Sequence, residues 1–524
     1  MSVNVFHYGE DILSAGIALN ICRKKTKGIL STSARENIRL NRHAVESIVK
    51  GHKTVYGINT GFGPLCTTLI NEEDTKRLQY NLLLSHSVGV GEPVDQEISK
   101  LMLILKVHSL AKAYSGVSTE LLERIIWHID HDVIPIVPSQ GSVGASGDLA
   151  PLAHLFLPLV GLGRVVYRGE ELPALDVLRM YQLQPLEPGP KEGLALINGT
   201  QFMLAHGIVL LEKLQNCLDH ADIIAAMNLE ALMGSAKSFD EELHLLRPYP
   251  GSQYVAQRFR TLLDRSEIIH SHENCARVQD PYSLRCIPQV HGASRDAWLH
   301  LKDRLQIEMN SVTDNPVVFH ELKTITGGNF HGQPLALPFD YAAVAAAELG
   351  NISDRRIYLS LCEVIPDLPR LLMKHTGLNS GFMILQYTSA ALVSENKSLC
   401  FPASADSIPT SLGQEDHVSM GSIGVRKALR IVENLEKILG IELFTAAQGF
   451  EFRKPLHSGY LIDKWHEWIR QEIEFAENDR LFSPDLEKAI ELIRSKKLIK
   501  RMHKERILHQ IDFKNDDHER FGIY

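Results

Sequence analysis

The tripeptide Ala145-Ser146-Gly147 has the composition of a segment that can react with itself. It lies in the stretch GSVGASGDLAPLAH, residues 141–154, whose first seven positions hold three glycines, two serines and one alanine. If the chain bends tightly here, the amide nitrogen of Gly147 can attack the carbonyl carbon of Ala145, and loss of water closes a five-membered ring. Loss of the Ser146 hydroxyl as a second water leaves an exocyclic methylidene. The product, 4-methylidene-imidazol-5-one, is an electrophile made from the chain, without an external cofactor.

The residue types of this tripeptide favour cyclisation over the other common use of a glycine-rich loop. Gly147 exposes its nitrogen and tolerates unusual dihedral angles, Ala145 is small, and Ser146 supplies the hydroxyl that leaves. A glycine-rich turn before a helix can also bind phosphate through backbone N–H groups. This stretch matches neither GxxxxGK[ST] nor GxGxxG, and no lysine follows it to meet a phosphate. The spacing therefore argues against a phosphate site.

Composition and charge narrow the class of protein. The chain has 524 residues, 44% hydrophobic and 23% charged, which is typical of globular proteins with large cores. Its formal net charge is -8, so nucleic acid is not an expected partner. There is no apolar run of about 18 residues and no secretory signal at the N-terminus. The seven cysteines show no CxxC spacing, which favours free thiols. We therefore expect a cytoplasmic protein without a membrane span or a metal site.

The elements that must position the tripeptide differ between the two halves of the chain. Apolar residues recur every three or four positions over 211–232 and 425–439, which predicts long buried helices. The alanine-rich segment 340–361 predicts a helix whose neighbours can approach closely. The first half alternates shorter helices with glycine-rich loops and is more broken. The densely charged residues 496–524 predict a solvated helix and tail with no chemistry of their own.

An ordered series of motifs resembles the histidine and aromatic amino-acid ammonia-lyase family. The resemblance implies a mainly α, fumarase-like fold: a loop-rich N-terminal region over 1–200 that carries the tripeptide, and a bundle of long central helices with a C-terminal helical segment over 201–524. It also implies a homotetramer whose active sites take loops from more than one subunit. The matching strings, in chain order, are VYGINTGFGP, GSVGASGDLAPLAH, EGLALINGTQ, VQDPYSLRCIPQV, DNPVVF, GGNFHG, NSGFMI, SENK and PTSLGQEDHVSMG.

The resemblance implies an enzyme that eliminates ammonia from an amino acid. The methylidene electrophile takes up the substrate's amino nitrogen and makes it a better leaving group, which splits a difficult step into easier ones. With L-histidine the products are trans-urocanate and ammonia, the first step of histidine degradation. The alternatives are a tyrosine or phenylalanine ammonia-lyase or an aminomutase with the same prosthetic group. A catalytically inactive helical scaffold would not need the intact tripeptide.

The same resemblance assigns residues to the reacting centre. Tyr56 in VYGINTGFGP and Tyr282 in DPYSLR match the two family tyrosines near that centre, and either could be the base. A free phenol has a pKa of about 10, so nearby cations or helix N-termini must lower it. Arg285 matches the residue that holds the substrate carboxylate, for which a guanidinium offers a bidentate fit. Asn198 in INGTQ matches the asparagine beside the ring, which helps to fix that carboxylate.

Four further residues bear on the identity of the substrate. Gln279 and Phe330 fall in matching strings and are expected to line the pocket. His86 matches the selectivity position, but Ser-His occurs there in histidine-specific and in some tyrosine-specific members. Glu415 stands where phenylalanine- and tyrosine-specific branches generally have glutamine, and its carboxylate suits an imidazole N–H. Glu415 therefore favours histidine, while the preceding LQYNLLLSHS, which also resembles tyrosine-specific members, keeps tyrosine open.

Overall fold

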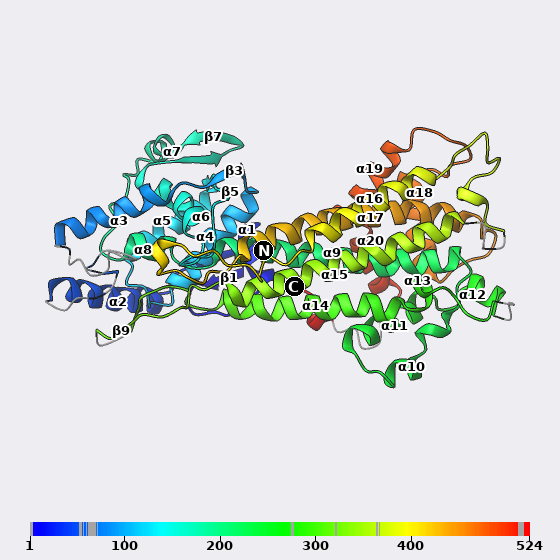
Figure 1. Ribbon diagram of the computed structural model, residues 1–524, viewed down its shortest axis with the longest axis horizontal. Coiled ribbons are helices and arrows are strands. Elements are labelled where there is room, and N and C mark those ends of the chain that lie inside the picture. The colour runs from blue at the N-terminus through cyan, green and yellow to red at the C-terminus, as the bar shows by residue number, and fades with distance from the viewer. Residues whose placement is uncertain are drawn as a thin grey trace.

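Four long helices run side by side along the longest axis of the computed structural model (Figure 1). They are α9 (Gln201–Ala231), α14 (Ile287–Met309), α15 (Gln333–Leu361) and α17 (Gly421–Glu451). At 1.5 Å per residue, the 31 residues of α9 extend over about 46 Å. A fifth helix, α16 (Met383–Leu399), packs against α15 and α17. The mainly α fold is confirmed, and the helices are longer than the apolar stripes that predicted them.

The description of the structure covers most of the chain, in several ranges. No helix within those ranges is both long enough and apolar enough to cross a membrane. The cysteines described there, Cys22, Cys217, Cys286, Cys362 and Cys400, carry free thiols, as predicted. The described residues are 4–51, 55, 57–58, 60, 70, 72–273, 277–319, 322–362, 365, 367–511 and 518–523.

Shorter helices and small sheets precede α9 and gather at one end of the bundle (Figure 1). The helices are α1 (Ala15–Cys22), α2 (Thr32–Lys50), α3 (Glu72–His86), α4 (Gln96–Leu110), α5 (Thr119–His131), α6 (Leu149–Phe156), α7 (Ala174–Met180) and α8 (Glu192–Ile197). The sheets are the parallel pair β1 (Asn4–His7) and β2 (Thr26–Ile29), the antiparallel pair β3 (Val90–Pro93) and β5 (Pro138–Gln140), and the antiparallel β4 (Ile134–Pro135), β6 (Arg164–Tyr167) and β7 (Glu170–Pro173). The tripeptide lies between β5 and α6. The division of the chain at residue 200 stays a prediction.

The remaining elements connect or follow the long helices. Those between α9 and α15 are α10 (Glu241–Leu245), α11 (Pro250–Leu262), α12 (Glu267–Ser271), α13 (Tyr282–Arg285) and the antiparallel strands β8 (Val317–Val318) and β9 (Thr324–Ile325). Those after α17 are α18 (Tyr460–Glu472), α19 (Ser483–Arg494), α20 (Lys497–Leu508) and α21 (His518–Phe521).

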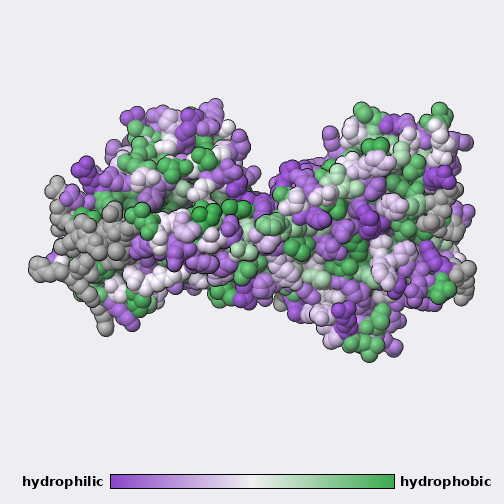
Figure 2. Space-filling model, viewed as in Figure 1, coloured by the Kyte–Doolittle hydropathy of each residue, from purple (hydrophilic) through white to green (hydrophobic). Residues whose placement is uncertain are grey.

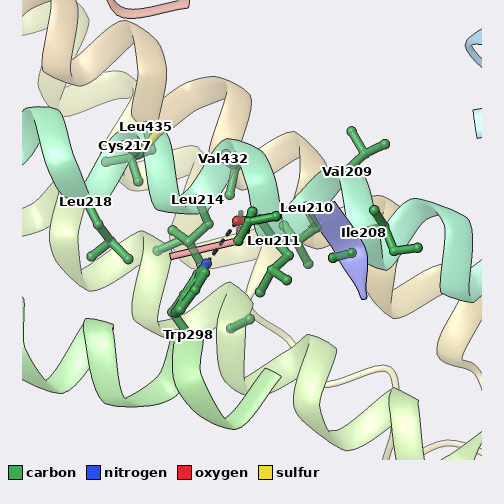
Figure 3. Packing of buried hydrophobic residues seen from close by; sticks show 14 of the residues in the cluster. Ile208, Val209, Leu210, Leu211, Leu214, Cys217, Leu218, Trp298, Val432 and Leu435 are labelled. Carbon is green, nitrogen blue, oxygen red and sulfur yellow. Dashed lines mark hydrogen bonds between the residues drawn. The ribbon is translucent and has the colours of Figure 1, made fainter. Parts of the chain in front are cut away.

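The core of the molecule runs along α9, which is buried on nearly every side. A helix that is apolar around its whole circumference is stable only when other elements cover it, and α14, α15 and α17 do so. Figure 3 shows Leu211 and Leu214 of α9 packed near Val432 of α17 and Trp298 of α14. The indole N–H of Trp298 donates to the Leu211 carbonyl at 2.9 Å, which satisfies the one polar group of this buried ring.

The charged C-terminal segment is docked on the bundle, so the prediction of a solvated helix and tail was wrong in part. It does form the helix α20, but Leu498 and Met502 on that helix are buried. Phe521 is buried as well, and its ring centre lies 4.6 Å from that of Tyr254 on α11. The Lys302 ammonium on α14 donates to the Gly522 carbonyl at 2.7 Å. The density of charge in the sequence hid the few apolar residues that anchor the segment.

A buried ion pair joins α15 to α17 in the middle of the bundle. The guanidinium of Arg356 and the carboxylate of Glu442 are both fully buried, and their Nη2 and Oε2 atoms lie 3.0 Å apart. Ser353 also donates to that carboxylate. A buried pair adds little net stability, but removing one partner leaves a desolvated charge without its counterion. Loss of either partner is therefore expected to destabilise the packing of α15 on α17.

We expect Arg356→Met to lower the free energy of unfolding by about 3–5 kcal/mol, because it leaves Glu442 as an uncompensated buried charge. The double variant Arg356→Met/Glu442→Leu should recover part of that loss. Arg304→Met, at an exposed position on α14, is the control and should change stability by less than about 0.5 kcal/mol. Denaturant unfolding measures all three. A double variant that is no more stable than Arg356→Met alone would contradict a direct pair.

Candidate active site

The tripeptide lies in a tight left-handed bend of the loop between β5 and α6. Ser146 has φ of +52° and Gly147 has φ of +87°, so two successive residues occupy the left-handed region. A residue with a side chain is uncommon there, and holding Ser146 in it costs about 1 kcal/mol or more. Gly144, just before the tripeptide, has φ of +73°. The chain is therefore bent into the left-handed region at three of the four positions 144–147.

The backbone of Gly199, between α8 and α9, holds this bend in place. Its N–H donates to the Ser146 carbonyl at 3.2 Å, and its own carbonyl accepts from the Asp148 N–H at 2.8 Å. Gly147 and Gly199 thus form a parallel bridge. A Cβ at Gly147 would overlap the Gly199 carbonyl, so the approach of the two backbones requires glycine at position 147.

The buried carboxylate of Asp148 ties the loop to α9. One of its oxygens accepts from the Ser142 hydroxyl at 2.8 Å and the other from the Met203 N–H at 3.0 Å. Burial raises the pKa of the Asp148 carboxyl to about 6, although these hydrogen bonds and the Lys106 ammonium act to lower it. Sequence reasoning did not single out Asp148. Its position, directly after the tripeptide and at the N-terminus of α6, was the available signal.

Glu415 reaches the tripeptide from the loop between α16 and α17. Its Oε1 accepts from the Ser146 hydroxyl at 3.1 Å, and its Oε2 accepts from the Thr410 hydroxyl at 2.9 Å. His86, at the end of α3, lies close enough for an electrostatic interaction with this carboxylate. Burial lowers the pKa of His86 below its usual value, while the charge of Glu415 acts to raise it. Two of the predicted substrate residues therefore meet at the tripeptide.

A pocket of about 190 Å³ lies beside the tripeptide. Asn198, at the end of α8 and directly before Gly199, is buried, and its Oδ1 has no hydrogen-bond partner among the described residues. A buried acceptor without a partner is costly and leaves a site for a donor. The pocket is lined by Ser85, His86, Val88, Gly141, Ser142, Val143, Ala145, Gly147, Leu149 and Ala150.

The turn that carries Phe330 lies against the loop that carries Glu415. Phe330 is half-buried. The imidazole Nε2 of the next residue, His331, lies 3.1 Å from the His417 carbonyl, and the two histidine rings stack with centres 6.0 Å apart. Phe330 is therefore at the same end of the molecule as the tripeptide.

Gln279, Tyr282 and Arg285 lie elsewhere, at the opposite end of the long helices. Figure 1 shows α13, which carries Tyr282 and Arg285, far along the bundle from α6 and the tripeptide loop. The Tyr282 side chain is 70% exposed, and the Arg285 guanidinium carbon lies 4.5 Å from its ring centre. A single chain does not bring these three residues to the tripeptide. Tyr56 lies outside the described residues.

Comparison with known proteins identifies the family of this chain. The family described as "Aromatic amino acid lyase" matches residues 13–471. This chain belongs to the aromatic amino acid lyase family. It is 47% identical to the histidine ammonia-lyase of Natranaerobius thermophilus, over 91% of this chain and 94% of that protein.

Solved structures of the aromatic amino acid lyase family have the same fold. The histidine ammonia-lyase from Trypanosoma cruzi superimposes with a TM-score of 0.89 at 38% identity, covering 99% of this chain and 97% of that one. A tyrosine aminomutase from Streptomyces globisporus gives a TM-score of 0.90 at 31% identity, covering 96% and 99%. The family and fold that the motifs implied are thereby confirmed.

We expect Gly147→Ala to destabilise the protein more than Gly169→Ala. The two glycines have nearly the same φ, +87° and +84°, but an added Cβ meets the Gly199 backbone at position 147 and no atom within 4 Å at position 169. Gly169→Ala should cost about 1–2 kcal/mol from backbone strain alone. Gly147→Ala should cost more, because the loop must also move away from Gly199. Equal losses in denaturant unfolding would mean that the two backbones are not in contact.

Proposed function

We propose that this chain deaminates L-histidine without oxidation, releasing trans-urocanate and ammonia. The observation that carries the proposal is the carboxylate of Glu415, 3.1 Å from the Ser146 hydroxyl of a tripeptide suited to cyclisation. An imidazole N–H can donate to such a carboxylate, whereas the phenyl ring of phenylalanine and the phenol of tyrosine present no ring N–H. The relatives named histidine ammonia-lyase, which align with most of the chain, support the same substrate.

We propose 4-methylidene-imidazol-5-one, formed from Ala145, Ser146 and Gly147, as the prosthetic group. The left-handed bend and the close approach of Gly199 fit a segment that must fold onto itself. When formed, the group supplies an electrophilic carbon that makes the substrate's amino group a better leaving group. The Gly199 N–H, which donates to the Ser146 carbonyl oxygen, would hold the ring at that oxygen.

The other residues bind and orient the substrate in this proposal. His86, whose pKa is lowered by burial, holds the substrate ring from another side than Glu415. Asn198 lies beside the prosthetic group and helps to fix the substrate carboxylate, which Arg285 binds as a bidentate ion pair. Either Tyr56 or Tyr282 removes the β-proton. Gln279 and Phe330 line the pocket.

We further propose a homotetramer in which the 279–285 segment of one subunit completes the site of another. The position of α13, far from the tripeptide of its own chain, supports this arrangement (Figure 1). On α15, Leu337, Tyr341 and Val344 are each at least half exposed and share one helix face at spacings of four and three. Figure 2 shows hydrophobic residues, in green, among the purple hydrophilic ones on the face in view. An exposed apolar helix face is typical of a surface that another subunit covers.

Glu415→Gln tests the choice of substrate, because it keeps the size of the side chain and removes its charge. A hydrogen bond to a charged group is worth about 1.5–3 kcal/mol, so kcat/KM for histidine should fall roughly ten- to a hundredfold. Turnover of tyrosine or phenylalanine should fall much less or rise. Glu433→Gln, at a half-buried position on α17 where the carboxylate pairs with Arg430, is the control. Equal losses on histidine and tyrosine would make Glu415 structural and would remove the main support for histidine.

Complementation between two inactive variants tests the shared site. Ser146→Ala and Tyr282→Phe chains, provided that each alone has much less activity than the wild type, should regain activity when they are co-expressed and purified together, because about a quarter of hybrid sites would draw an intact segment from each chain. Ser146→Ala with Asn198→Ala is the matched control. Both of those residues lie at one end of a chain, so no hybrid site would be intact. Absence of activity in the first hybrid, with chain mixing verified, would contradict the shared site.

A further inference from the structure

Lys106 is a buried cation behind the tripeptide loop, in the middle of an apolar helix. It lies on α4, in the segment LMLILKVHSL, and only 1% of its surface is exposed. Burying an ammonium is costly unless hydrogen bonds compensate for its lost hydration. Its Nζ donates to the Asn198 carbonyl at 2.5 Å and to the Ala195 carbonyl at 3.2 Å. Both carbonyls belong to the C-terminal end of α8, where the helix dipole favours a positive charge.

Among the described residues, no carboxylate forms a salt bridge with Lys106. Asp314 and Asp148 favour its charged form, while Lys191 opposes it. Asp314 is paired with Lys191, with Nζ and Oδ2 at 2.6 Å, and Asp148 is hydrogen-bonded to Ser142 and Met203. The ammonium is therefore directed at the backbone. Its side chain is buried and its Nζ donates to two backbone carbonyls, so it is not placed to touch a substrate.

The hydrogen bonds of Lys106 lead directly to the tripeptide through one peptide group. The Asn198 carbonyl that accepts from Lys106 and the Gly199 N–H that donates to the Ser146 carbonyl are the two polar ends of the same planar peptide. A cation at the oxygen of a peptide makes its N–H a stronger donor, because hydrogen bonds in a chain polarise one another. The charge on Lys106 thus strengthens the contact between Gly199 and Ser146.

We propose that Lys106 is a positioning residue for the Ala145-Ser146-Gly147 loop, acting through the Asn198–Gly199 peptide. This inference rests on the proposed function, since it concerns the segment that cyclises. In that ring the Ser146 carbonyl is retained and is conjugated with the methylidene, whereas the Ser146 hydroxyl oxygen has left as water. A strong donor at this oxygen draws electron density away from the methylidene carbon and keeps it electrophilic.

The effect should depend on pH, because Lys106 must be charged to produce it. Burial lowers the pKa of Lys106 to about 7, so the charge is lost as the pH rises through that value. The charged groups facing it are Asp314, Asp148 and Lys191, and of these Asp148 has a pKa of about 6. The pH series must therefore span pH 7, and because burial also lowers the pKa of Lys191, comparison with Lys106→Met assigns the change to Lys106.

The test compares Lys106→Met, which keeps the length of the side chain but not its N–H groups, with Lys106→Gln, which keeps a neutral donor. Lys100→Met is the matched control, because Lys100 is also buried on α4 but donates to Asp132 at 2.5 Å. Intact mass reports cyclisation as the loss of two waters, and near-ultraviolet absorbance reports the electronic state of the ring. Thermal unfolding verifies that each variant folds.

We expect folded Lys106→Met to cyclise incompletely or to show a shifted absorption band, with kcat at least about tenfold lower and KM little changed. Lys106→Gln should lie between Lys106→Met and the wild type. The band of the wild type and of Lys100→Met should change with a midpoint near pH 7, and that of Lys106→Met should not. A Lys106→Met protein with complete cyclisation and an unchanged band would overturn the proposal.

Two other outcomes separate this inference from the function on which it rests. If both Lys106 variants fail to fold while Lys100→Met folds, Lys106 is a residue of the core and the positioning role is wrong. If the wild-type protein itself has lost no water, the cyclisation is refuted, whatever the variants do.

Discussion

The contact between the Gly147 and Gly199 backbones is the constraint on which the rest of the site depends. It joins the tripeptide loop to the residue just before the N-cap of α9, and the contact requires the absence of a side chain at position 147. Two backbone hydrogen bonds hold the contact, and a Cβ at position 147 would overlap the Gly199 carbonyl, so any side chain there would displace the loop. Everything that holds α6, α8 and α9 relative to one another therefore also sets the conformation of the tripeptide.

The long helices supply the rigidity that this contact needs. α9 is buried along its length, so its N-terminus is fixed by packing against α14, α15 and α17 rather than by the loop alone. Asp148 attaches the tripeptide loop to α9 by accepting a hydrogen bond from the Met203 N–H. Glu415, in the loop before α17, accepts a hydrogen bond from the Ser146 hydroxyl. Reactive groups held on rigid elements keep their geometry, which a strained left-handed bend at Ser146 requires.

The sequence predicted those parts of the site that depend on local residue types. The tripeptide could be recognised from its chemistry, and the stripes over 211–232 and 425–439 predicted buried helices that exist. The roles of Lys106 and Asp148 could not be predicted, because Lys106 meets Asn198 across 92 positions of the chain and nothing local marks that pairing. The motifs also gave no sign that α13 lies at the far end of the bundle. Spatial distance within one chain is not encoded in the order of motifs.

The intact mass of the purified wild-type protein, set beside that of Ser146→Ala, tests the central claim most directly. If the tripeptide cyclises as its bend and composition indicate, the wild type is lighter than its sequence by two waters. The loss maps to the peptide that contains residues 141–154, and the protein converts histidine to urocanate. Ser146→Ala folds, does not lose the second water, and has no activity. A wild-type protein of full sequence mass that deaminates histidine, or a Ser146→Ala protein that does so at the wild-type rate, would contradict the account.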